Sequence, residues 1–233
     1  MATKSANDEQ TRLKQQAAER ALAFVEPGMT VGLGSGTTAT LWIKLLGEKV
    51  RDQGLKIRAI ASSDDSEKLG KSYGIPFTSF DETRTLDLTV DGADEVAPGL
   101  ALIKGGGGKL LREKIVASAS KRFVVVVDQS KVVEKLGRFP LPVEVIQMAE
   151  PLVSAELSEL GFTPKVRTNK DGSPYITDEG NLILDCSGML IDDPKAMAEK
   201  LDSIVGVVEH GLFLGMAKVV LVAGEGGVVE RTK

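Results

Sequence analysis

The sequence predicts an α/β fold, in which a mostly parallel sheet is flanked by helices and a smaller α/β domain is inserted near the C-terminus. Apolar strand-like runs alternate with helical patterns over residues 8–131, an order typical of a parallel sheet covered by helices. The run "FVVVVD" at 123–128 is almost entirely β-branched, as in a strand buried on both faces. A β-α-β-β-α-β order follows over residues 139–215. The first part is therefore expected to be Rossmann-like and the second ferredoxin-like.

Composition narrows the class of protein. The chain has 233 residues, of which 42% are hydrophobic and 27% charged, a balance typical of a folded globular protein. Its formal net charge of -4 and its lack of a basic, aromatic-rich stripe argue against a nucleic-acid partner. The longest aliphatic run is far shorter than a membrane helix, and the polar N-terminal stretch has no apolar signal core. We therefore expect a cytoplasmic protein that binds neither nucleic acid nor membrane.

The chain has one cysteine, Cys186, and one histidine, His210. A single cysteine excludes a disulfide within the chain and a multi-cysteine metal site. A single histidine excludes a cluster of histidine ligands, and no motif frames His210, so we expect it to be structural.

The elements of the first part follow from periodicity and from turn residues. A helix is predicted from Asp8 to Val25, because apolar residues recur on one helical face before Pro27 ends the pattern. A strand, a Gly-Ser-Thr turn and an amphipathic helix follow over 30–54. Further strands are predicted at 56–63, 75–80, 85–90, 100–104 and 122–128, and further helices at 64–74 and 109–120.

The second part has a different order of predicted elements and begins with two prolines. Strands are predicted at 139–146, 163–168, 181–186 and 205–215, with helices at 149–161 and 193–204. Residues 217–233 are predicted to form a strand and a terminal hairpin that return to the first domain. We thus predict a catalytic domain of residues 1–137 plus 212–233 and a smaller domain of residues 138–211.

Four polar stretches directly follow apolar strands. They are "GSGTT" at 34–38, "DGADE" at 91–95, "KGGGG" at 104–108 and "DQSK" at 128–131. Ligands of open parallel sheets bind outside the carboxyl ends of the strands, so we expect these four stretches to meet at one edge.

The stretch "VGLGSGTTA" fits a single phosphate better than a dinucleotide. It lacks the G-x-G-x-x-G spacing and an acidic residue after the second strand, and it lacks the Gly-Lys-Ser/Thr of a P-loop. The hydroxyls of Ser35, Thr37 and Thr38, free backbone N–H groups and the helix dipole suffice for one phosphate. The alternative is a glycine turn whose Ser and Thr only cap the helix.

The other stretches carry candidate acids and bases. Asp91 and Asp94 could chelate a divalent cation or serve in acid–base chemistry, or they could form an Asx-rich turn in solvent. Glu113, early in the helix after the glycines, could be stabilised there by the helix dipole alone. Beside Lys104, however, Glu113 becomes a candidate base whose cationic neighbour would stabilise an oxyanion. Glu95 is expected to be peripheral.

Together the motifs resemble a known family. "GLGSGTTA", "DGADE", "KGGGG…LLREKI", "VVDQSK" and "FPLPVEV", in this order, closely resemble ribose-5-phosphate isomerases of the A type. The resemblance implies interconversion of D-ribose 5-phosphate and D-ribulose 5-phosphate through an enediolate, in the non-oxidative branch of the pentose phosphate pathway. It also implies a larger and a smaller α/β domain, a homodimer or homotetramer, and neither cofactor nor metal.

The resemblance assigns roles motif by motif. Glu113 would be the base, Asp91 and Asp94 would handle the sugar hydroxyls and ring opening, and Lys104 would stabilise the enediolate. The remaining substrate-binding positions would be Ser35, Gly36, Thr37, Thr38, Gly92, Ala93, Gly105, Gly106, Gly107 and Lys131, with Lys14 of the first helix reaching the phosphate. Lys109 departs from the small residue that is commoner there, and adds a charge near the mouth of the site.

Two other classes of function remain open on the residues alone. One is a different enzyme on a related sheet, such as an aminosugar-phosphate deaminase or a CoA transferase. The other is a sugar-phosphate sensor without catalysis, which could keep the phosphate loop but need not keep Glu113 and Lys104 together.

Overall fold

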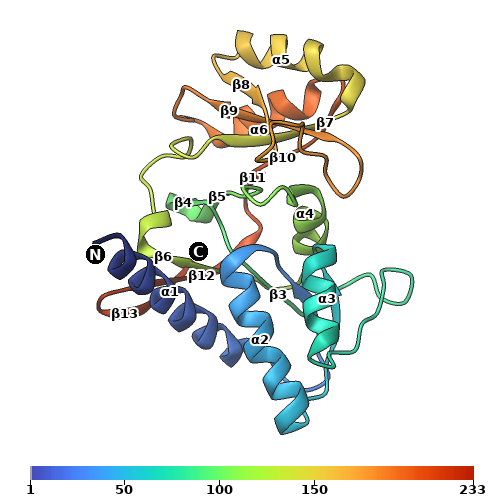
Figure 1. Ribbon diagram of the computed structural model, residues 1–233, viewed down its shortest axis with the longest axis vertical. Helices are drawn as coiled ribbons and strands as arrows, with labels where there is room; N and C mark the ends of the chain where they lie inside the picture. Colours follow the sequence, from blue (N-terminus) through green and yellow to red (C-terminus); the bar gives the residue numbers. More distant parts are fainter. Residues whose placement is uncertain (1) are drawn as a thin grey trace. The chain divides into compact units, whose positions relative to one another are not determined.

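The computed structural model describes residues 2–233, with side chains from Asp8 onward. The chain divides into two compact units (Figure 1). The first contains Met1–Ala93, Arg112–Val132 and Met216–Lys233, and the second contains Asp94–Leu111 and Val133–Gly215. The chain therefore passes from one unit to the other several times.

A six-stranded sheet forms the centre of the first unit, in the order β13-β12-β6-β3-β1-β2. Neighbouring strands are parallel except β12 and β13, which form an antiparallel hairpin. The strands are β1 Thr30–Leu33, β2 Arg58–Ala61, β3 Leu88–Asp91, β6 Phe123–Asp128, β12 Ala217–Gly224 and β13 Gly227–Thr232. Every residue of β6 is buried, as its β-branched sequence predicts.

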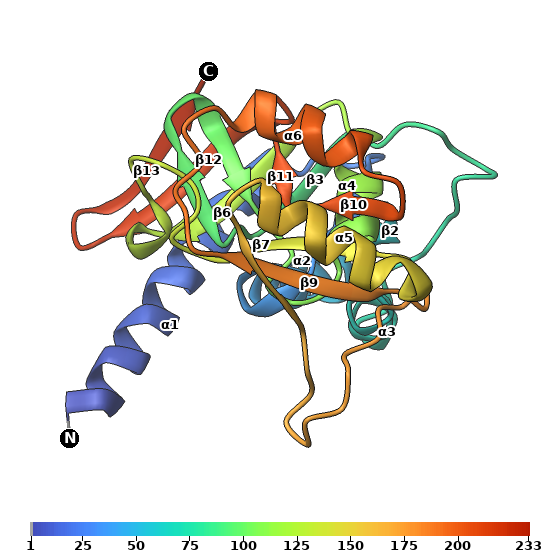
Figure 2. The same cartoon turned by 90° about the horizontal axis from the view of Figure 1, so that it is seen from above.

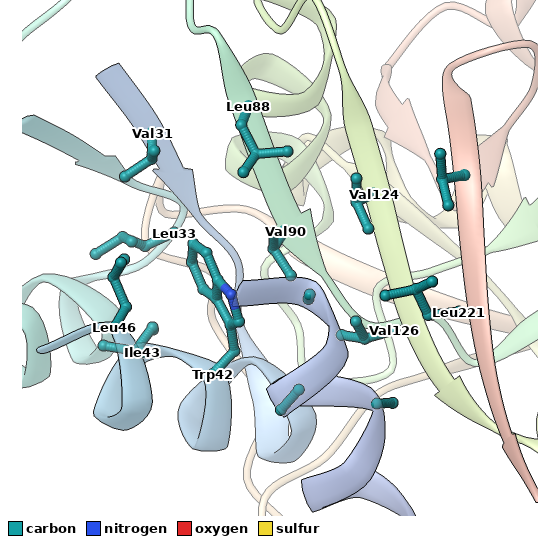
Figure 3. Close-up of a cluster of buried hydrophobic side chains, with 14 of the residues drawn as sticks. Val31, Leu33, Trp42, Ile43, Leu46, Leu88, Val90, Val124, Val126 and Leu221 are labelled. Atoms are coloured by element: carbon teal, nitrogen blue, oxygen red, sulfur yellow. The ribbon is translucent and has the colours of Figure 1, made fainter. Parts of the chain in front are cut away.

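Helices cover this sheet because their apolar stripes match its faces. They are α1 Ala2–Ala21, α2 Gly36–Gln53, α3 Asp64–Ser72 and α4 Leu110–Ser118, with short 3-10 turns at Leu22–Phe24 and Gln129–Lys131. Trp42 of α2 packs with Leu33, Val90 and other strand residues in one buried cluster that also includes α1 (Figure 3). Burying a large apolar side chain of this kind contributes about 1.5–3 kcal/mol.

The second unit has an antiparallel sheet in the order β10-β7-β9-β8, with two helices over it (Figure 2). Its β-α-β-β-α-β order and this strand order are those of a ferredoxin-like unit. Its elements are β7 Leu141–Val145, α5 Glu150–Glu159, β8 Thr163–Val166, β9 Leu182–Ser187, α6 Pro194–Ser203 and β10 Val207–His210. A second, three-stranded sheet joins β11 Leu212–Phe213, β5 Ala101–Ile103 and β4 Glu95–Ala97. Short 3-10 turns lie at Pro98–Leu100 and Gln147–Ala149.

The predicted fold class is confirmed, since a mostly parallel sheet is flanked by helices and a smaller antiparallel unit is inserted. The expected return of residues 217–233 is also confirmed, because β12 pairs with β6. Two expected strands differ. Residues 75–80 contribute only a single bridge, between Phe77 and Ala59. Residues 205–215 form two strands in different sheets, because the chain turns at Gly211, whose N–H donates to the carbonyl of Pro142.

The second unit is larger than the expected smaller domain of residues 138–211. It also includes residues 94–111, which form β4 and β5 of its three-stranded sheet. Whether 138–211 is a domain in its own right stays a prediction. In the described part of the chain, no helix combines the length and the apolar character that crossing a membrane requires.

Candidate active site

Three of the four polar stretches lie at one edge of the parallel sheet. Strands β1, β3 and β6 are neighbours, and their carboxyl ends lead into residues 34–38, 91–93 and 128–131. The fourth stretch, "KGGGG", follows β5, which belongs to the three-stranded sheet of the second unit. The expectation that all four stretches share one sheet edge is therefore wrong. The run "LALIK" is apolar enough for a strand, but nothing in it indicates which sheet it joins.

Asp91, the last residue of β3, holds the loop that follows β1. Its side chain is only 1% exposed, and Oδ1 accepts hydrogen bonds from the backbone N–H groups of Ser35 at 2.9 Å and Gly92 at 2.7 Å. A Cβ atom at Gly34 would lie 2.3 Å from the Asp91 carboxyl carbon, so only glycine lets β1 approach this closely. Asp91 is thus a buried, fixed carboxylate and not part of a turn in solvent.

The loop after β1 presents helix N–H groups instead of capping them. Ser35 occupies the N-cap of α2, but its hydroxyl lies 2.8 Å from the hydroxyl of Ser62 and does not cap the helix. The first turn of α2 contains no acidic residue, and Lys14 of α1 donates to the hydroxyl of Thr37 at 3.1 Å. The dipole of α2 and a cation therefore meet at one point, as an anion site requires. The alternative that Ser35 serves only to cap the helix is wrong.

Three buried serines after β2 extend this loop, and the sequence reasoning did not assign them a role. Ser62 pairs with Ser35, and Ser66 donates to the carbonyl of Gly34 at 2.7 Å. Ser63 caps α3 by accepting from the N–H of Ser66. The available signal was the "ASS" that stands where a dinucleotide-binding fold has an acidic residue. In this chain the hydroxyls of Ser62 and Ser66 hold the loop after β1 in place.

Glu113 lies in the first turn of α4 and is 5% exposed. Val116, one turn later on the same helical face, packs with Ile60 and Leu86 beneath the helix. Because α4 lies in the crossover between the parallel neighbours β3 and β6, it runs back along the sheet and begins at their carboxyl edge. Glu113 is therefore a buried carboxylate at the same edge of the sheet as Asp91.

Lys104 and Asp94 belong to the second unit. Lys104 is 2% exposed, its backbone N–H donates to the carbonyl of Gly211, and its ammonium lies 5.5 Å from the centre of the Phe213 ring. Asp94 accepts the N–H of Gly106 through Oδ2 at 2.8 Å. A Cβ atom on Gly106 would lie 2.6 Å from Asp94 Oδ1, so glycine is needed for this contact. Positive φ angles at Gly105 and Gly108 favour glycine at those two positions as well.

The other side of the glycine loop is held by the connection between β8 and β9. Arg167 donates to the carbonyls of Gly105 at 2.9 Å and Gly106 at 3.2 Å. Lys109 forms an ion pair with Asp178 at 2.5 Å, with the two side chains 18% and 17% exposed. Lys109 is therefore engaged in a partly buried ion pair that anchors the loop.

The remaining predicted residues are placed as follows. Lys131 ends the 3-10 turn after β6, which Asp128 begins by accepting the N–H of Ser130 at 3.0 Å. Glu95 is buried and accepts the N–H groups of Gly137 and Phe139, each at 2.7 Å, so its role is to hold that loop. The first unit carries Lys14, residues 35–38, residues 91–93, Glu113 and Lys131, and the second carries Asp94 and residues 104–107.

A second group of possible metal ligands, formed by Asp202, Glu209 and His210, does not make a metal site. The Nδ1 atom of His210 accepts the N–H of Leu212 at 3.2 Å. In the neutral imidazole the proton must then be on Nε2, which lies 3.2 Å from Asp202 Oδ1. Metal binding through Nε2 would require the other tautomer and would break the hydrogen bond from Leu212, so these contacts favour a structural role for His210.

Comparison with known proteins decides what this arrangement does. The sequence model of a family described as ribose 5-phosphate isomerase A (phosphoriboisomerase A) matches residues 58–227. A ribose-5-phosphate isomerase A from Roseiflexus sp. (strain RS-1) is 50% identical over 93% of this chain and 94% of that protein. One from Gluconobacter oxydans (strain 621H) is 53% identical over 92% of this chain and 94% of that protein. The chain belongs to the ribose 5-phosphate isomerase A family.

Solved structures of ribose 5-phosphate isomerases agree. The enzyme from Methanocaldococcus jannaschii has a TM-score of 0.91 and 42% identity, covering 95% of this chain and 99% of that one. A D-ribose-5-phosphate isomerase in complex with phospho-erythronic acid has a TM-score of 0.92 and 39% identity, covering 95% and 98%. The chain is thus a ribose-5-phosphate isomerase, which interconverts ribose 5-phosphate and ribulose 5-phosphate in the pentose phosphate pathway. This excludes the deaminase, the CoA transferase and the sensor.

Proposed function

We propose that Glu113 is the base of this isomerisation. The supporting observation is a carboxylate that is 5% exposed, in the first turn of α4 at the carboxyl edge of β3 and β6. An aldose becomes a ketose when a base removes the proton from C2 and returns it to C1. Meanwhile the hydroxyl proton of O2 moves to O1, so no atom is gained or lost. The negative charge that forms on the oxygens of the enediolate requires a nearby cation.

Lys104 is proposed to supply that cation, and Asp91 and Asp94 to move protons between the sugar oxygens and during ring opening. A lysine that is 2% exposed beside an aromatic ring acts in a low dielectric, where its charge stabilises an oxyanion strongly. Both aspartates are oriented by backbone N–H groups before any sugar binds. The backbone of Gly105, Gly106 and Gly107, with Gly92 and Ala93, would line the sugar.

The phosphate is proposed to bind at the N-terminus of α2. Residues 35–38 supply N–H groups and hydroxyls, Lys14 stands at Thr37, and Lys131 adds a second cation. A relative of this chain binds phospho-erythronic acid, a ligand with a phosphate at one end and a carboxylate at the other, so a site in this family accepts a phosphate. The carboxylate resembles the planar, negative enediolate. Binding energy from the phosphate can then orient the reacting carbons.

Glu113→Gln tests the base. We expect kcat for ribose 5-phosphate to fall about 10²–10⁴-fold, the contribution of a general base, because the amide cannot accept the C2 proton. The Kd of phospho-erythronic acid should change little, because the proposed phosphate ligands do not include Glu113. Glu67→Gln, on the exposed face of α3 where Glu67 pairs with Lys71, is the matched control. Near-normal kcat in the Glu113→Gln variant would remove Glu113 from this role.

We also propose that the chain assembles as a homodimer or a homotetramer. Apolar side chains gather on the surface of the second unit, where Met148 is 87%, Leu152 70% and Val205 89% exposed. The bond from the N–H of Ile146 to the carbonyl of Gly206 places the segment after α6 beside the start of α5. An exposed group of large apolar residues is a common mark of a protein–protein contact.

A further inference from the structure

Arg167 donates hydrogen bonds to two successive peptide carbonyls of the glycine loop. It follows β8, and its backbone N–H donates to Ile183 of β9. The guanidinium donates from one terminal nitrogen to the carbonyls of Gly105 and Gly106, at 2.9 and 3.2 Å. Its other two nitrogens form a fork on Asp185 of β9, at 2.9 and 2.5 Å. The side chain of Arg167 is 14% exposed, so water competes little with these bonds.

The consequence for the loop follows from peptide geometry. In a trans peptide the C=O and the N–H point in opposite directions. In the peptide group between Gly105 and Gly106, the carbonyl accepts from Arg167 and the N–H donates to Asp94. In the next peptide group, between Gly106 and Gly107, the carbonyl of Gly106 accepts from Arg167. The N–H of Gly107 therefore points away from the arginine.

Only arginine matches all these contacts at once. Its planar fork is bidentate to a carboxylate, whereas the ammonium of lysine is a single point charge. Glycines resist a fixed orientation more than other residues because they lose the most conformational freedom, so this loop needs external restraint. Tyr175 adds to that restraint, since a Cβ on Gly108 would lie 2.5 Å from its hydroxyl.

We propose that Arg167, held by Asp185, is a positioning residue for the isomerisation. It orients the loop so that Asp94 is fixed by Gly106 and the N–H of Gly107 faces the sugar oxygens. Arg167 acts on the reaction through the backbone of the glycines and not by touching substrate. This inference rests on the proposed role of Asp94 and of the glycine loop.

The test is a comparison of kcat and KM for ribose 5-phosphate in Arg167→Lys and Arg167→Gln. We expect kcat to fall about ten- to a hundred-fold, because small misplacements of a reacting group are costly. KM should stay within about threefold, because the proposed phosphate ligands belong to the first unit. A merely structural role would lower the melting temperature and the active fraction without this split. Asp185→Asn keeps the bonds to the glycines but weakens the fork that holds Arg167, so kcat should fall less than in Arg167→Gln, with KM unchanged. If the Arg167 variants fail to fold, a normal kcat in Asp185→Asn overturns the inference.

Arg51→Lys is the matched control, because Arg51 makes the same forked contact with Asp52 on the surface of α2. Its kcat should equal that of the unchanged protein. A folded Arg167→Lys or Arg167→Gln variant with kcat within twofold of normal, or a rise in KM alone, overturns the inference. Glu113→Gln in the same assay separates the two proposals: if it loses kcat while the Arg167 variants do not, only the positioning role fails.

Discussion

Asp91 fixes two loops of the fold, and it is also the residue that we propose handles protons of the sugar. Its carboxylate is oriented by two backbone N–H groups from the loops after β1 and β3, an orientation that would suit the proposed role. The contact depends on a residue that carries no side chain. Gly34 lies directly against the carboxyl group, and any larger residue there would displace it.

Gly34→Ala should therefore lower both activity and stability, because the added atom has no room beside the buried Asp91. A Cβ atom 2.3 Å from the carboxyl carbon must push Asp91 or the β1 loop aside, and we expect kcat to fall at least about tenfold. The measurement is kcat for ribose 5-phosphate together with the melting temperature. Gly226→Ala is the control, since a Cβ atom at Gly226 would have no other atom within 4 Å. Equal kcat values in the two variants would show that the approach of β1 to Asp91 does not matter.

At the scale of an element, β7 contains a buried acid that has no part in the proposed mechanism. Glu144 is 1% exposed and accepts hydrogen bonds from the Thr177 hydroxyl at 2.8 Å and the Asn181 amide at 2.9 Å. Burial raises its pKa above the ordinary value of 4.5, and the charges of Glu179 and Glu209 add to the rise, while the two hydrogen bonds oppose it. Glu144 thereby ties the far end of the β8–β9 connection to the sheet.

This raised pKa gives stability a definite pH dependence. Between 4.5 and the raised pKa the folded state holds a proton that the unfolded state has lost, so the free energy of unfolding falls as pH increases through that window. Glu144→Gln cannot titrate, and its free energy of unfolding relative to the unchanged protein should rise over the same window. Urea denaturation at a series of pH values from about 4 to 8 measures the difference.

Glu199→Gln, on the exposed surface of α6, is the control for the loss of one carboxyl group. Its curve of unfolding free energy against pH should run closer to that of the unchanged protein than the curve of Glu144→Gln. Parallel curves for Glu144→Gln and the unchanged protein would mean that the burial of Glu144 does not shift its titration.

The sequence predicted the helices, strands and loops better than it predicted contacts between distant residues. Alternating apolar runs and glycine or proline turns predicted the parallel sheet, the antiparallel unit and the loops after β1, β3 and β6. These patterns are local, so they can be read within a window of about ten residues. The placement of β5 and the role of Arg167 could not be read in this way. Arg167 contacts glycines 61 and 62 positions away, and no periodicity encodes such a contact.

For the whole molecule, self-association is the property most open to test. We expect a dimer or a tetramer by sedimentation equilibrium or light scattering, and we expect Leu152→Lys to shift the protein toward smaller species. Leu152 is 70% exposed on α5, so the change should leave the fold of one chain intact while it places a charge within the apolar surface. Lys195→Glu, on exposed α6, is a control for added charge. An unchanged oligomer in Leu152→Lys would exclude this surface from the contact.

The order of strands in the central sheet affects how the protein folds while it is being synthesised. Strand β6 is covered on one edge by β3, which precedes it, and on the other by β12, which comes after the whole of residues 133–215. During synthesis β6 therefore leaves the ribosome with one edge bare, and it stays so until residues 217–224 appear. An edge as apolar as "FVVVVD" is prone to pair with a neighbouring chain. The antiparallel unit can form in that interval, so the edge of β6 is closed only after residues 133–215 have been made.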